Sequence, residues 1–142
     1  MMLGRLKPEF GSIRVFGADP RSLTSNIPGP GVGYMPQELA LFNEFTIEEM
    51  LIYFANIFHM TSEELKDRTK QLLQLLNLPE KDRRVGQLSG GQKRLVSIAV
   101  TIVHKPKLII LDEPTVGVDS MLRCRIWLYF EDLCRQYGMA FH

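Results

Sequence analysis

The sequence predicts an α/β fold built on a parallel sheet, with a block of helices inserted between two of its strands. Three observations support this fold class. The segment Leu108–Leu111 is apolar at every position, which is typical of a central strand that is buried on both faces. The expected elements run in the order strand, strand, helices, strand, helix. Finally, the chain of 142 residues is long enough to bury a core, and its length suggests one domain.

Two short strands are expected near the start of the chain. The run Ser-Ile-Arg-Val-Phe, within Gly11–Phe16, predicts the first strand. A loop rich in Pro, Gly, Ser and Asn extends from Asp19 to Gly33. The second strand is predicted at Val32–Met35, so the helices begin only after both strands.

Three helices are expected next, each with an apolar stripe at helical spacing. Two of them begin at capping boxes, in which a Thr and a Glu three residues later satisfy each other's backbone N–H groups: Thr46 with Glu49, and Thr61 with Glu64. Pro79 stops the second helix, and the third is predicted from Gln92 to His104. We interpret the apolar stripes as core or docking surfaces, not as a cofactor site.

The last part of the chain is expected to hold one strand and one helix. A turn from Pro114 to Asp119 follows the strand Leu108–Leu111, and a helix is predicted from about Ser120 to Tyr137. Gly138 ends this helix in the usual C-terminal manner. Only three residues separate Gly138 from His142, which is too short for a full further strand and its exit turn.

Several polar side chains are expected to have no role in a functional site. A solvated face is predicted for three basic residues of the middle helices: Lys66, Arg68 and Lys70. His104 is expected in the last turn of its helix, where partial positive charge is favourable. Cys124 and Cys134 lie too far apart on one helix to bridge, so both are expected as reduced thiols.

The composition excludes some classes of protein. The net charge is +1, from 17 basic and 16 acidic residues, and no basic arm or stripe is present, so nucleic acid is not an expected partner. The first seven residues hold no apolar run long enough for a signal peptide. No stretch approaches the roughly 20 apolar residues that span a bilayer.

Two motifs indicate nucleotide chemistry. The run Leu88–Gln92, LSGGQ, is a turn that leads into a helix, where unpaired N–H groups and a serine hydroxyl suit a phosphate. The run Leu108–Glu113, LIILDE, is a buried strand that delivers two carboxylates at its end. A carboxylate in that place can hold Mg²⁺, and the next one can polarise an attacking water. An anion site and a metal-and-base site therefore lie on one chain.

Together these motifs resemble the signature sequence and the Walker B strand of the ATP-binding cassette (ABC) ATPases. The resemblance implies a partial RecA-like P-loop NTPase core with an all-helical subdomain over residues 38–90, which ends in the signature motif. It covers nearly all of residues 1–142 and is closest to eukaryotic transporters of subfamilies G and H. It implies ATP and Mg²⁺ as ligands.

The resemblance also assigns roles to individual residues. Asp112 matches the aspartate that helps hold Mg²⁺, and Glu113 matches the glutamate that activates water. Gln37 resembles the Q-loop glutamine, which reaches the metal and the attacking water and lies where the transmembrane partner docks. The signature turn matches the residues that contact ATP held mainly by a second subunit: Ser89, Gly90, Gly91 and Gln92.

Asp119, in Val116–Ser120, resembles the D-loop aspartate that links the two sites of a dimer. An alternative interpretation is that Asp119 or Ser120 caps the last helix, and both can be true. The phosphate loop GxxxxGK[ST] is absent from these 142 residues, and none of the lysines follows a glycine. The aromatic residue that stacks on adenine, and the switch histidine with its strand, are expected to lie outside this chain.

The leading hypothesis is a fragment of the ATP-hydrolysing domain of a membrane exporter. It would act on the cytoplasmic face of the membrane, paired head to tail with a second nucleotide-binding domain and attached to a transmembrane domain. An alternative is a non-catalytic fragment that pairs with an intact domain and modulates it. A third is a soluble ABC protein of translation or DNA repair. The isolated chain is expected to have little ATPase activity and poor solubility.

Overall fold

The computed structural model describes residues 9–22, 29, 31–38, 40–137 and 140–141. Its centre is a parallel sheet of three strands in the order β1–β2–β3: β1 (Val32–Met35), β2 (Leu108–Leu111) and β3 (Ala140–Phe141). The register pairs Val32 with Leu108 and Met35 with Leu111. The α/β class and the parallel sheet predicted from the sequence are therefore confirmed.

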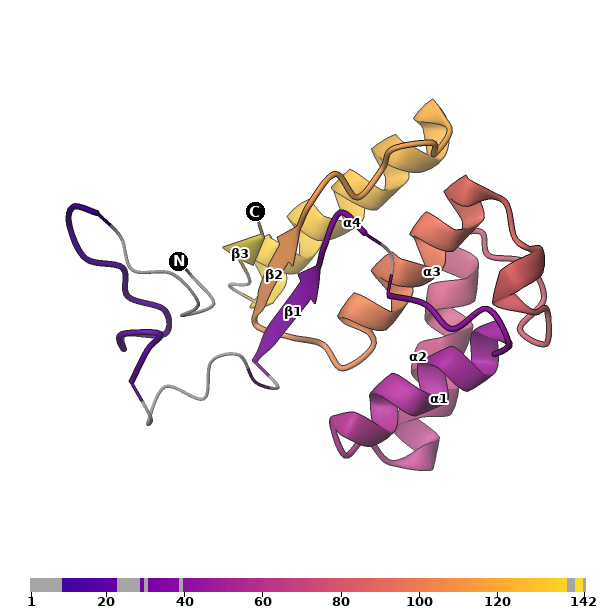
Figure 1. Ribbon diagram of the computed structural model, residues 1–142, viewed down its shortest axis with the longest axis horizontal. Coiled ribbons are helices and arrows are strands. Elements are labelled where there is room, and N and C mark those ends of the chain that lie inside the picture. The colour runs from indigo at the N-terminus through magenta and orange to yellow at the C-terminus, as the bar shows by residue number, and fades with distance from the viewer. Residues whose placement is uncertain (1–8, 23–28, 30, 39, 138–139, 142) are drawn as a thin grey trace.

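Four α-helices and one 3-10 helix accompany the sheet in the described residues: α1 (Ile47–Ile57), α2 (Ser62–Leu75), η1 (Val85–Gln87), α3 (Gly90–Ile102) and α4 (Ser120–Tyr137). The two predicted capping boxes are both present at the starts of α1 and α2. Figure 1 shows α1 and α2 at one end of the molecule, away from the sheet, while α3 extends from this end toward β1. None of the helices in the described ranges is both long and apolar enough to cross a membrane.

β2 carries apolar contacts on both faces, as its sequence predicts, although Ile110 is only half-buried. Ile109 and Leu111 belong to the main core, which also contains buried side chains of α1, α3 and α4. Leu108 packs with Val15 and Val32 in a second, smaller cluster. The strand thus carries apolar contacts on each side, and its carboxyl end is held in place within the fold.

α3 packs closely against β1 at Gly33. A Cβ atom at this position would lie 2.6 Å from the carbonyl oxygen of Thr101, so the contact requires glycine. This contact, together with the core side chains of α3, fixes the helix that carries the signature turn relative to the strand that leads to Gln37.

Two expected strands differ in the structure. The strand predicted at Gly11–Phe16 is wrong: Val15 and Ala18 form an isolated antiparallel bridge instead. The reason is the Phe16-Gly17 pair, in which both residues have left-handed backbones (φ 52° and 80°), as in a type I′ hairpin turn. The expectation that the strand after the last helix is lost is also wrong, because β3 pairs with β2 at Ala140. Gly138 and His142 lie outside the described residues.

Arg68 corrects the prediction of a solvated basic face. Lys66 and Lys70 are exposed, but Arg68 is only 6% exposed. Its Nη2 donates to the carbonyl oxygen of Ile102 at 3.0 Å, and its Nη1 donates to the Tyr129 hydroxyl at 3.0 Å. The buried guanidinium therefore bonds to both α3 and α4, and the Ile102 carbonyl oxygen that it contacts also accepts from the Lys105 N–H at 3.1 Å.

A second arginine makes a similar contact. Arg125 of α4 donates from Nε and Nη2 to the carbonyl oxygen of Leu75 and from Nη2 to that of Gln74, at the C-terminal end of α2. Arg68 and Arg125 therefore connect α2 to both α3 and α4 by hydrogen bonds at helix ends. These contacts hold α2 next to the sheet-bound helices.

His104 also differs from its prediction. α3 ends at Ile102, so His104 lies beyond the helix, where its ring stacks on Phe58 with centroids 3.6 Å apart. Burial lowers the pKa of His104 to about 4, the Val32 backbone opposes this shift, and the positive charge of Arg68 adds to it. The side chain is therefore neutral near pH 7, and the expected positive charge is wrong. Cys124 and Cys134 are both free thiols, as predicted.

Candidate functional site

The carboxyl ends of β1 and β2 bring together two predicted site residues. Gln37 follows β1 and Glu113 follows β2, and the two strands are parallel and in register. Gln37 Nε2 donates to Glu113 Oε2 at 3.4 Å, although the residues are 76 positions apart. Both side chains are exposed. We call this group, with Asp112, the carboxyl edge.

The backbone at the carboxyl edge separates its two acidic residues. Asp112 continues the register of the sheet, because its N–H donates to the carbonyl oxygen of Met35 at 3.0 Å. Glu113 has a φ of 47°, in the left-handed region that few non-glycine residues adopt. A conformation of this kind costs a non-glycine residue about 1–3 kcal/mol. The chain therefore turns away from the strand direction immediately after Asp112.

The signature turn, Ser89–Gln92, is the N-terminus of α3. Ser89 is the N-cap: its Oγ accepts from the Gln92 N–H at 3.2 Å, and its own N–H donates to Gln92 Oε1 at 3.0 Å. This is a third capping box. Because the serine oxygen accepts from the backbone, its O–H proton remains available for an outside acceptor. The N–H groups of Gly90 and Gly91 occupy the first turn, where a helix provides no acceptor.

The signature turn packs against the segment that follows β2. A Cβ atom on Gly91 would lie 2.5 Å from the carbonyl oxygen of Gly117, so only glycine fits this contact. Gly117 itself has a left-handed φ of 76°. In Figure 1 the chain after β2 runs across to the start of α3 before it enters α4.

Asp119 acts as the N-cap of α4. Its Oδ1 accepts from the N–H groups of Met121 at 2.9 Å and Leu122 at 3.2 Å. The structural alternative for Asp119 is therefore observed. Its predicted role in a dimer stays a prediction, and the cap fixes the end of the segment that touches Gly91.

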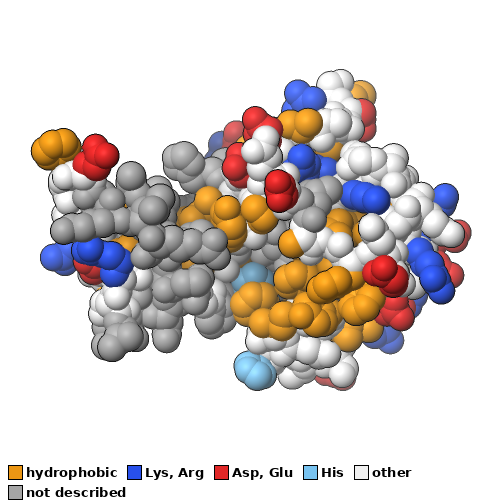
Figure 2. All heavy atoms as spheres, viewed as in Figure 1, with side chains coloured by type: hydrophobic (Ala, Val, Ile, Leu, Met, Phe, Trp, Pro, Cys, Tyr) orange, Lys and Arg blue, Asp and Glu red, His pale blue; other side chains and the backbone are white. Residues whose placement is uncertain are grey.

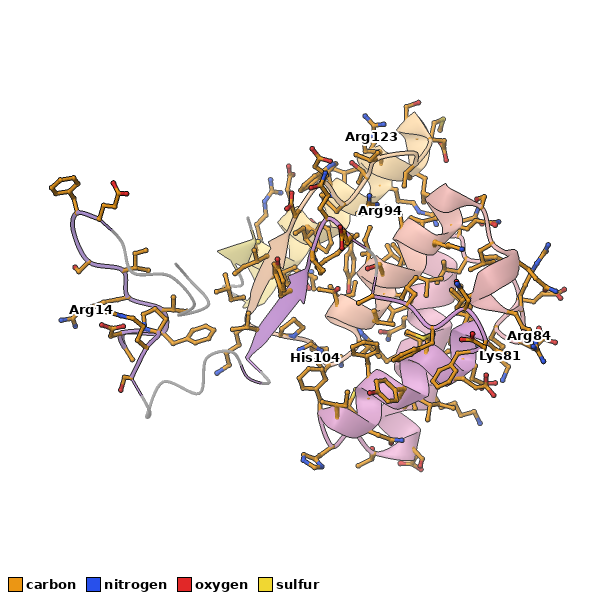
Figure 3. All side chains as sticks on the ribbon, in the orientation of Figure 1. Arg14, Lys81, Arg84, Arg94, His104 and Arg123 are labelled. Atoms are coloured by element: carbon orange, nitrogen blue, oxygen red, sulfur yellow. The ribbon has the colours of Figure 1, made fainter. Side chains whose placement is uncertain are left out.

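One contact between the helix of the signature turn and the carboxyl edge was not predicted from the sequence. Arg94 of α3 donates from Nη1 to the backbone carbonyl oxygen of Gln37 at 2.9 Å. Figure 3 shows Arg94 extending from α3 toward the chain that leaves β1. The sequence contained no signal for this contact, because it depends on how α3 lies against β1.

The comparisons with known proteins decide the family. A family model described as "ABC transporter" matches residues 1–116. The chain belongs to the ABC transporter family. Its predicted assignment as a partial nucleotide-binding domain of that family is confirmed.

Members of the ABC transporter family from distant organisms resemble this chain. It is 44% identical over 139 residues to ABC transporter G family member 23 of Dictyostelium discoideum, and covers 20% of that relative with 98% of its own length. It is 38% identical over 134 residues to the probable multidrug ABC transporter ATP-binding protein YbhF of Escherichia coli (strain K12), covering 23% of that protein with 94% of itself. The chain spans about a fifth of the length of these curated relatives.

A solved structure shows the same fold. The dimeric structure of MJ0796, a bacterial ABC transporter cassette, superposes with a TM-score of 0.67 at 27% identity, over 77% of this chain and 50% of that one. The likeness supports the partial RecA-like core and the helical block predicted from the sequence.

The carboxyl edge has the donor types that suit the magnesium ion of an ABC nucleotide site. The carboxylate of Asp112 and the amide oxygen of Gln37 are hard oxygen donors, and Asp112 is exposed at the end of its strand. Mg²⁺ is usually held by one or two such groups together with phosphate oxygens and water. Within the described ranges, no group of three or more His, Cys, Asp and Glu side chains is arranged to hold a metal.

Proposed function

We propose that this chain is the central part of the ATP-hydrolysing domain of a membrane transporter. The contact between Gln37 and Glu113 supports this proposal most directly, because it joins the two residues expected to handle the attacking water. The signature turn supports it independently, since its serine hydroxyl and helix N-terminus both suit a phosphate group.

In this proposal residues 38–90 form the helical subdomain, and the remainder belongs to the RecA-like core. α1, α2 and η1 all fall within residues 38–90, and the strands of the sheet fall outside this range. The signature motif then begins at the end of the subdomain and continues into α3.

The carboxyl edge would perform the hydrolytic chemistry at this chain's own ATP site. Glu113 accepts a proton from the attacking water and so makes it a better nucleophile, while the amide of Gln37 orients both the water and the carboxylate. Asp112 and Gln37 would hold Mg²⁺, which neutralises charge on the phosphates when it is bound. The protein's contribution is positioning and electrostatic stabilisation.

The signature turn would serve a site shared with a second nucleotide-binding domain. We propose that two domains pair head to tail, so that the turn binds the γ-phosphate of ATP held by the partner: Ser89, Gly90, Gly91 and Gln92. The dimeric state of the MJ0796 cassette supports this arrangement. Asp119 would connect the two sites, because its segment already contacts Gly91 through Gly117.

An exposed aromatic cluster supports a transmembrane partner. Four rings lie in contact along α1 and the loop before it: Phe42, Phe45, Tyr53 and Phe54. Phe42 is 44% exposed and Tyr53 is 42% exposed, and Figure 2 shows an apolar patch on the face that carries α1. We propose that the cytoplasmic end of a transmembrane export domain covers this cluster, since exposed apolar patches mark interaction sites.

The test is hydrolysis by the full-length protein that contains this chain. We expect Glu113→Gln to lower kcat by at least about 100-fold while ATP still binds, because the amide removes the base and keeps the shape. ATP turnover by purified protein in lipid is the measurement, and nucleotide binding is measured on the same sample. Unchanged turnover in Glu113→Gln would overturn the proposed function and favour a modulating role.

A further inference from the structure

Arg94 connects two regions that the proposed function assigns to different ATP sites. It lies on α3, five residues after Ser89, and its Nη1 donates to the Gln37 carbonyl oxygen at 2.9 Å. The side chain of the same Gln37 donates to Glu113 at 3.4 Å. A continuous path of two hydrogen bonds therefore leads from the signature helix to the proposed catalytic carboxylate.

The helix end of this path is rigid. The residues that follow Arg94 on α3, Leu95 and Val96, are 5% and 0% exposed. The α-helical rise of 1.5 Å per residue places Arg94 only about 8 Å along the axis from Ser89. Any movement of the signature turn that tilts or shifts α3 therefore also moves the base of the Arg94 side chain.

The loop end of the path is lightly held. Gln37 and Glu38 are exposed. The loop after β1 is described at Pro36–Glu38 and Ala40. Within these residues, one hydrogen bond joins the loop backbone to a helix, from Arg94 to the Gln37 carbonyl oxygen. A charged donor makes a stronger hydrogen bond than a neutral one, and the guanidinium holds its donors in a fixed plane. The position of the Gln37 backbone therefore depends on α3 through Arg94.

We propose that Arg94 is a positioning residue that couples the signature turn to the carboxyl edge through Gln37. When the turn engages a phosphate of the partner's site, α3 and Arg94 set the place of Gln37, and Gln37 sets the place of Glu113 in this chain's own site. Occupation of one ATP site then adjusts hydrolysis at the other. This inference rests on the proposed function.

The test is a double-mutant cycle in the full-length protein. We expect Arg94→Met to lower kcat about tenfold, with ATP affinity changed less than twofold, because the variant misplaces the amide of Gln37 without touching nucleotide. In a Gln37→Ala background the same change should lower kcat less than twofold, since Arg94 no longer has a side chain to position. Arg94→Lys should restore part of the loss.

Lys93→Met is the matched control, because it removes a cation from the neighbouring position on α3, where the side chain faces Asn43. It should leave kcat within twofold of the wild type. Equal losses from Arg94→Met in both backgrounds would show a merely structural role and overturn the coupling, as would no loss at all. Glu113→Gln tests the proposed function separately: if that variant still hydrolyses ATP, the proposed function fails first.

Discussion

The signature turn is built from residues that are neighbours in the sequence, whereas the carboxyl edge is built from residues 76 positions apart. In the turn, Ser89 and Gln92 satisfy each other and start the helix, so the functional groups also stabilise the local structure. At the edge, Gln37 and Glu113 are exposed, and their meeting depends on strand register. Substitutions in the turn should therefore affect both stability and function, and substitutions at the edge should affect function alone.

The largest effect on stability should come from the contact between the turn and the segment after β2. We expect Gly91→Ala to destabilise the domain by about 1–3 kcal/mol, because its Cβ would lie 2.5 Å from the Gly117 carbonyl oxygen and the backbone would have to move. Chemical denaturation followed by fluorescence of the one tryptophan measures this change.

Gly90→Ala is the matched control for that experiment. A Cβ at Gly90 meets nothing within 4 Å, and alanine favours the helix over glycine by about 0.5–1 kcal/mol. The control should therefore be neutral or stabilising. Equal destabilisation by both alanine variants would show that the Gly91 contact has no special cost.

The next prediction compares the stability of a variant in the signature turn with that of a variant at the carboxyl edge. We expect Ser89→Ala to destabilise the domain by about 1 kcal/mol, since it removes the N-cap of α3. Gln37→Ala should change stability by less than about 0.5 kcal/mol, because the side chain is exposed and packs against little. Thermal unfolding of both variants, measured beside their ATP turnover, checks the contrast. A similar loss of stability in both would break the distinction between the two regions.

The last effect concerns His104, just beyond the other end of α3. His104 has a pKa of about 4 in the folded chain, below its ordinary value of 6.5. The unfolded chain therefore binds the proton first, so stability should fall as the pH drops from 6.5 to 4 and should not depend on His104 above 6.5. Because the side chain is only partly buried, we expect a loss of about 1 kcal/mol.

His104→Phe should remove that part of the pH dependence and keep the stack on Phe58. Unfolding midpoints of the two proteins, compared from pH 7 down to pH 4, are the measurement. Parallel curves over this range would contradict the lowered pKa.

The contrast between contacts of sequence neighbours and contacts of distant residues also explains which features the sequence could predict. The capping boxes at Thr46 and Thr61 depend on residues three positions apart, so the starts of α1 and α2 could be predicted from the sequence. The box at Ser89 has the same spacing, but α3 begins at Gly90, two residues before its predicted start at Gln92. The strand at Leu108–Leu111 was predictable because a strand with apolar residues on both faces is typical of the centre of a parallel sheet.

Most of the failures, unlike the local turn at Phe16-Gly17, involve contacts between distant parts of the chain. Arg68 is buried because its guanidinium bonds to partners on α3 and α4, and Arg94 reaches Gln37 because α3 lies on β1. The two-residue strand β3 forms because β2 offers an unpaired edge. Local patterns of charge and hydrophobicity carry no information about such partners, so the residues were assigned to solvent or left without a role.

Glu113 shows how the backbone can direct the start of an exposed side chain. Its neighbours in space offer little packing, but its left-handed φ of 47° sets the bond from Cα to Cβ before any side-chain torsion is chosen. Branched residues such as valine and isoleucine are effectively barred from this conformation by steric crowding at Cβ. The backbone therefore sets the direction in which the side chain leaves the chain, and the bond from Gln37 sets where the carboxylate lies.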